Sequence, residues 1–104
     1  MTVRVLVVDD HPIVRGGLVA LLQGQPDVEV VGEASNAAEA ISRADDTMPD
    51  VVLMDLFMSG MDGLEATRVI HRQFPTVRVI ALTSFNEEGL VQNALQAGAI
   101  SYLL

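Results

Sequence analysis

The chain has 104 residues, 50% of them hydrophobic, which suits one domain with a single core. Its 14 acidic and 6 basic residues give a net charge of −8, which excludes a domain that holds DNA by its phosphates. No apolar run approaches the roughly 18 residues of a membrane span. A strand pattern starts at Val3 and cysteine is absent, so we expect no secretory signal, no membrane contact and a cytoplasmic location.

Strand and helix patterns alternate along the chain. The expected strands are Val3–Val8, Glu29–Ala34, Val51–Met54, Arg78–Leu82 and Ser101–Leu104. Helices of 10 to 13 residues or so between them imply right-handed crossovers and an α/β fold with a doubly wound parallel sheet. The complete pattern would be five strand–helix pairs, so the last helix is expected to be missing from residues 1–104.

The helices carry their own signals. In the first, which begins with Pro12, an inner face is expected from Ile13, Leu18, Leu21 and Leu22. Gly16 and Gly17 inside this helix are explained most simply by close packing on a neighbour. Asn36 and Glu39 match a capping box at the start of the second helix.

Glycines mark loops and a helix end further along. Gly60 and Gly63 are expected to allow the turns of the loop after the third strand. Asn86 begins a fourth helix, for which Gly98 is a natural C′ residue.

Three apolar strands end in polar residues. The strands and the residues that follow them are Val5–Val8 with Asp9 and Asp10, Val51–Met54 with Asp55, and Val79–Leu82 with Thr83 and Ser84. Such runs are typical of strands buried on both faces of a parallel sheet, where ligands bind beyond the carboxyl ends. We therefore expect an acidic pocket with a hydroxyl beside it.

Three carboxylates within roughly 4 Å of one another repel by several kcal/mol, even at an effective dielectric near 20. Protonation of one carboxylate or binding of a hard divalent cation relieves this repulsion. For Mg²⁺, Asp10 and Asp55 suit direct ligation, Asp9 suits a contact through water, and the Phe57 carbonyl completes the set. The plain alternative is that Asp9 and Asp10 only begin a turn and that Asp55 only caps the end of a strand.

A carboxylate is also a nucleophile that forms an aspartyl phosphate, and a bound metal would neutralise charge on the phosphoryl group. Thr83 is placed to donate a hydrogen bond to a phosphoryl oxygen on Asp55, and Ser84 is small enough to leave room. His11 is expected to face solvent at a helix start rather than to act in phosphotransfer.

The chain resembles the receiver domain of two-component response regulators. The matching motifs are Leu6–His11, Asp50–Asp55, Gly60–Gly63, Ala81–Ser84 and Ala97–Ala99. The match runs from Val3 to Leu104, and details such as Asp-Asp-His-Pro and Ser-Tyr-Leu-Leu are similar to the NarL/FixJ-like subfamily. The resemblance implies a flavodoxin-like sheet in the order 2-1-3-4-5.

The resemblance also implies a function. A sensor histidine kinase would phosphorylate Asp55, while Asp9, Asp10 and Asp55 hold Mg²⁺. Thr83 would swing toward the phosphoryl group and Tyr102 would turn inward. The domain would assist only its own phosphorylation and dephosphorylation, without being an enzyme. Expected consequences are homodimer formation and transcription regulation through a C-terminal helix-turn-helix DNA-binding domain outside this chain.

Two departures from the family pattern stand out. Ser59 replaces the usual proline, which predicts a looser loop after Asp55. The family's phosphate-contacting lysine follows the fifth strand, but residue 104 is the last residue and all basic residues are arginine. We therefore expect a receiver domain truncated before the lysine and the fifth helix.

Two other classes remain as alternatives. A phosphohydrolase with an aspartate nucleophile commonly has a general-acid aspartate two residues later, where this chain has Phe57. A nucleotide- or flavin-binding module needs a glycine-rich phosphate loop after the first strand, where this chain has Asp9–Pro12. Steady turnover of a phosphomonoester would favour the hydrolase, and a stable acyl phosphate on Asp55 would favour the receiver.

Overall fold

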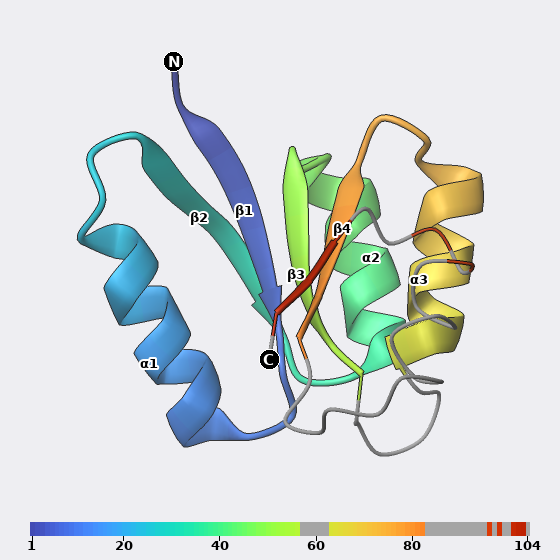
Figure 1. Cartoon of the computed structure of the whole chain (residues 1–104), viewed down its shortest axis with the longest axis horizontal. Helices are drawn as coiled ribbons and strands as arrows, with labels where there is room; N and C mark the ends of the chain where they lie inside the picture. Colours follow the sequence, from blue (N-terminus) through green and yellow to red (C-terminus); the bar gives the residue numbers. More distant parts are fainter. Residues whose placement is uncertain (57–62, 83–95, 97, 99–100, 104) are drawn as a thin grey trace.

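A parallel sheet of five strands organises the molecule (Figure 1). The computed structural model describes residues 1–56, 63–82, 96, 98 and 101–103. The strands are β1 (Val3–Val8), β2 (Val28–Ala34), β3 (Val51–Asp55), β4 (Arg78–Leu82) and β5 (Ser101–Leu103). Their order is β2-β1-β3-β4-β5, and every neighbouring pair is parallel. The expected fold class and strand order are therefore confirmed.

Helices cover both faces of this sheet (Figure 1). The helices α2 (Ala37–Thr47) and α3 (Gly63–Gln73) lie on one face, and α1 (Pro12–Gln23) lies on the other. The larger core cluster lies under α2 and α3, where small alanines on α2 let the helix approach the sheet closely. Within the described part of the chain, no helix has the length and apolar content that a membrane span requires.

Helix α1 buries a narrower face than the sequence indicates. Val19 is buried, and Leu18 and Leu22 pack against Val5 and Val7 of β1. The prediction was wrong for Ile13 and Leu21, which are 89% and 70% exposed. Helical periodicity identifies an apolar stripe, but the width that becomes buried depends on what lies against it. Among the described residues, α1 is the one helix on this face of the sheet.

The packing explanation for the paired glycines of α1 is also wrong. A methyl group built at Gly16 or Gly17 meets no atom within 4 Å outside the adjacent helix backbone. Neither glycine is therefore required by close packing on the described part of the chain.

Helix α2 has the predicted N-cap residue, Asn36, but the Glu39 carboxylate has a different hydrogen-bond partner from the one that a capping box predicts. The Asn36 side chain accepts a hydrogen bond from the Glu39 amide at 2.8 Å. The Glu39 carboxylate accepts hydrogen bonds from the amide and hydroxyl of Ser35, each at 2.8 Å, instead of completing the usual box at Asn36. The hydrogen bond from the Ser35 amide is the main reason that the pKa of Glu39 lies below its usual value.

Helix α3 starts against the end of β3. The Gly63 Cα faces the main chain of Asp55 and Leu56 so closely that a Cβ would overlap with it. Among the described glycines, a positive φ occurs at Gly98, at +118°, and not at Gly63. Gly63 is therefore explained by close approach, and the turn explanation is wrong for it. Gly60 and the helix expected from Asn86 lie outside the described residues, as does Leu104.

Candidate functional site

The acidic residues meet because of the register between β1 and β3. Val8 of β1 pairs with Met54 of β3, so the residues that follow, Asp9 and Asp55, are neighbours at the carboxyl edge of the sheet. Asp9 also extends the hydrogen bonding between β1 and β2, because its amide donates a hydrogen bond to the Ala34 carbonyl at 3.1 Å. Asp10 is the first residue of the turn that leads into α1. The predicted convergence of the three carboxylates is present.

Four side chains form one compact cluster at this edge. Asp9, Asp10, His11 and Asp55 each offer one ligand atom, and these atoms all lie within 4.8 Å of one another. The side chains of Asp9 and Asp55 are 7% and 13% exposed, whereas that of His11 is 65% exposed. The carboxylates thus line the floor of the site, and the imidazole ring covers it from the solvent side.

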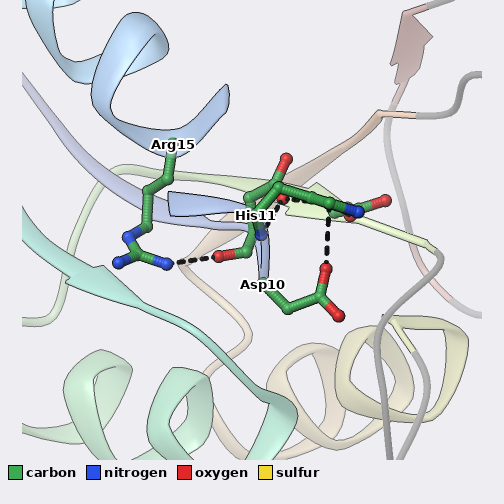
Figure 2. A network of polar contacts seen from close by, with 5 residues as sticks. Asp10, His11 and Arg15 are labelled. Carbon is green, nitrogen blue, oxygen red and sulfur yellow. Dashed lines mark hydrogen bonds and ion pairs between the residues drawn. The ribbon is translucent and has the colours of Figure 1, made fainter. Parts of the chain in front are cut away.

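The position of His11 adds a contact that sequence reasoning missed. Its Nδ1 lies 3.0 Å from carboxylate oxygens of both Asp9 and Asp10 and 3.9 Å from Asp55 Oδ2. Figure 2 shows a dashed line between the His11 side chain and the Asp10 carboxylate. The ring is exposed as expected, yet it also touches the acidic cluster. Its place directly after the acidic pair was the one available signal.

The carboxylates perturb this imidazole. The hydrogen bond with Asp9 raises the pKa of His11, and the negative charge of Asp10 raises it further. The sign is expected because each carboxylate favours the imidazolium form. The same concentration of negative charge that stabilises a protonated histidine also favours a bound cation.

The donor set suits a hard divalent cation. Carboxylate oxygens are preferred Mg²⁺ ligands, and this ion uses one or two carboxylates together with waters and phosphate oxygens. Here Asp10 and Asp55 lie in the same cluster as Asp9, and two of the three acidic side chains are largely shielded from bulk water. Unit charges about 4 Å apart repel by roughly 4 kcal/mol at an effective dielectric of 20, so a cation here relieves a substantial repulsion.

Other predicted site residues fall where the structure gives no side-chain geometry. Phe57, Thr83 and Ser84 lie outside the described residues. Tyr102 is described as part of β5, where it pairs with Ala81 of β4, and its side chain is outside the description. The switch role of Thr83 and Tyr102 therefore stays a prediction.

A comparison with family models identifies the domain. The model described as "Response regulator receiver domain" matches residues 5–104. The chain belongs to the response regulator receiver domain family. This membership favours the receiver interpretation over the phosphohydrolase and the flavin-binding module.

Curated relatives of this receiver domain support the same placement. It is 52% identical over 102 residues to the transcriptional regulatory protein LiaR of Bacillus subtilis, covering 98% of this chain and 48% of LiaR. It is 50% identical over 104 residues to the response regulator protein VraR of Staphylococcus aureus, covering 100% of this chain and 50% of VraR. The chain thus spans about half the length of the curated relatives it matches.

Solved structures agree with this fold. The signal receiver domain of the putative response regulator NarL from Mycobacterium tuberculosis superposes with a TM-score of 0.95 at 40% identity, covering 99% of this chain and 83% of that one. A LuxR-family two-component response regulator from Aurantimonas gives a TM-score of 0.93, also at 40% identity, with 98% and 73% coverage. The receiver domain is therefore similar to NarL- and LuxR-type regulators, in line with the predicted subfamily.

Proposed function

We propose that this receiver domain is a cytoplasmic phospho-acceptor whose Asp55 takes a phosphoryl group from a sensor histidine kinase with the help of Mg²⁺. The observation that carries the proposal is the convergence of Asp9, Asp10 and Asp55, with their ligand atoms within 4.8 Å. Asp55 ends β3 at the edge of the sheet where ligands bind in this class of fold.

Each residue has a distinct task in this proposal. Asp55 supplies the carboxylate oxygen that forms the new bond to phosphorus, while the bond from phosphorus to the donor's imidazole nitrogen breaks and that nitrogen takes up a proton. Asp9 and Asp10 would hold Mg²⁺ together with Asp55 and the Phe57 carbonyl. When bound, the cation would neutralise charge on the phosphoryl oxygens during in-line transfer.

The response to phosphorylation rests on residues next to the site. A phosphoryl group adds charge close to −2 and strong acceptor oxygens, which the Thr83 hydroxyl and the cation would satisfy. Movement of Thr83 would leave space for the Tyr102 ring. Carrying the domain from 1:99 to 99:1 in favour of its active form requires about 5.5 kcal/mol from these contacts.

The whole protein would regulate transcription. Two relatives, of which this chain covers about half, are named a transcriptional regulatory protein and a response regulator protein. Because the net charge of −8 disfavours phosphate contacts by this domain, DNA binding would belong to a C-terminal helix-turn-helix domain outside residues 1–104. Phosphorylation would promote a homodimer, and catalysis would be limited to the domain's own phosphorylation and dephosphorylation.

The test is chemical labelling of Asp55. The protein is incubated with a small phosphodonor and Mg²⁺, and intact mass and peptide mapping follow the added phosphoryl group. We expect one phosphoryl group on Asp55, a loss of labelling in Asp55→Asn and a requirement for the divalent cation. Equal labelling of Asp55→Asn would refute the assignment. Steady release of phosphate from a phosphomonoester would instead support a hydrolase.

A further inference from the structure

The carbonyl of Asp9 is held from outside the sheet by a side chain of α1. The Arg15 Nη1 donates a hydrogen bond to this carbonyl oxygen at 2.7 Å, an interaction drawn in Figure 2. The Arg15 Nε also donates to Glu33 Oε1 of β2 at 3.1 Å. One guanidinium therefore connects the end of β1 with the neighbouring strand.

These contacts close a loop around Asp9. Its amide donates to the carbonyl of Ala34, the residue after Glu33, at 3.1 Å. Its carboxylate Oδ1 accepts a hydrogen bond from the His11 amide at 2.8 Å. With Arg15 on the carbonyl, the amide, carbonyl and side chain of Asp9 each have a partner.

The contact by Arg15 occurs where the chain leaves the sheet. The ladder between β1 and β3 ends at the pair Val8 and Met54, and the turn into α1 begins directly afterwards. The orientation of the peptide between Asp9 and Asp10 decides where both carboxylates point. Arg15 fixes that peptide by its carbonyl oxygen, and its side chain is 20% exposed.

We propose that Arg15 is a positioning residue for the acidic site: it orients the Asp9–Asp10 peptide, with Glu33 orienting the guanidinium in turn. This inference rests on the proposed function, because it concerns how well the carboxylates are arranged for Mg²⁺. Substitution of a residue that orients a metal ligand without contacting the metal typically weakens metal affinity by about 10- to 100-fold.

The test measures Mg²⁺ affinity and unfolding separately on the 104-residue chain. We expect Arg15→Ala to weaken Mg²⁺ binding by about 10-fold in calorimetric or amide-shift titrations of the folded protein. Arg15 borders an open polar hollow of about 220 Å³ rather than the core, so this variant should fold. Arg15→Lys should recover part of the affinity, because an ammonium can reach one acceptor but lacks the fork that serves both.

Variants of Glu33 provide the second part of the experiment. Glu33→Gln should weaken Mg²⁺ binding less than Arg15→Ala, and the double variant should bind no more weakly than Arg15→Ala alone. Arg68→Ala is the matched control, because it also removes an arginine from an ion pair, the one with Glu65 on α3. We expect that control to bind Mg²⁺ like the original chain.

The outcomes separate this inference from the proposed function. Mg²⁺ affinity in folded Arg15→Ala within about twofold of the original would leave Arg15 a purely structural role and overturn the inference alone. Additive effects of Glu33→Gln and Arg15→Ala on Mg²⁺ affinity would also overturn the inference alone. The contacts predict instead that Glu33 acts through Arg15. An original chain that binds no Mg²⁺ would remove the proposed function and this inference with it.

Discussion

Gly63 and Asp55 approach each other so closely that no side chain fits between them. A Cβ at Gly63 would overlap the carbonyl oxygen of Asp55 and lie 2.7 Å from the Cα of Leu56. Both obstacles are main-chain atoms, which cannot rotate away as a flexible side chain would. The start of α3 and the proposed phospho-acceptor are therefore mechanically linked.

Gly63→Ala is predicted to damage both stability and the site. Relief of the overlap requires α3 or the end of β3 to shift, and overpacking of this kind costs about 1–3 kcal/mol. Urea unfolding should show that loss of free energy of unfolding. Labelling of Asp55 by a small phosphodonor should slow in the fraction that remains folded. Labelling at the original rate would show that α3 moves instead of Asp55.

Gly16→Ala and Gly17→Ala are predicted to stabilise the protein. Both positions lie inside α1 and leave open space for a methyl group, so the helix gains without a clash. Each substitution should raise the free energy of unfolding by about 0.5–1 kcal/mol in urea. These variants also serve as the control for Gly63→Ala, and a loss of stability in them would contradict the open space seen here.

Asp10→Asn is predicted to weaken Mg²⁺ binding by at least about tenfold, or 1.4 kcal/mol. It replaces an anionic ligand with a neutral amide in the cluster of Asp9, His11 and Asp55. The matched control is Asp45→Asn, which makes the same charge change at an exposed position of α2. Titration should find nearly unchanged affinity in this control. Equal losses in both variants would mean that net charge, not ligation, governs binding.

Glu39 is predicted to give a stability contribution that depends on pH. Its pKa lies below the ordinary value of 4.5, because the ionised form accepts hydrogen bonds from Ser35. The native state therefore holds its proton less tightly than the unfolded chain does. The contribution is complete above 4.5 and is lost as pH falls through the lower, folded pKa. Urea unfolding of the original protein and Glu39→Gln should give a stability difference near neutral pH that shrinks under acid conditions. A constant difference would contradict the role of the charge.

Met48→Gly is predicted to stabilise the end of α2. Met48 has a φ of 42° and a ψ of 64°, the left-handed conformation that glycine adopts without a steric penalty. Its side chain is 46% exposed, so little buried contact is lost. The gain of about 0.5–1 kcal/mol should appear as a higher midpoint in urea. A lower midpoint would show that the methionine side chain contributes more than the backbone strain costs.

The strands and the acidic cluster could be predicted because two simple patterns coincide. Runs buried on both faces, such as Val5–Val8, are continuous in apolar residues and stand out from the polar positions that follow them. Parallel strands then bring those positions to one edge. The convergence of Asp9, Asp10 and Asp55 could be predicted from these two patterns alone.

Features that depend on tertiary neighbours could not be predicted in the same way. The exposure of Ile13 and Leu21 depends on what covers α1, and a helical stripe does not contain that information. The close approach of Gly63 to Asp55 depends on the path of the chain between β3 and α3. Arg15 contacts the main-chain carbonyl of Asp9, and no recognisable sequence motif links these two residues.

Because Val8 pairs with Met54, the number of residues in β1 and β3 decides whether Asp9 and Asp55 become neighbours. A shift of one residue between β1 and β3 would turn every side chain of the shifted strand to the opposite face. An insertion or deletion within Val51–Met54 would therefore remove Asp55 from the carboxylates of Asp9 and Asp10, although every acidic residue would still be present. Changes in length along β3 should be far less tolerated than substitutions among its apolar residues.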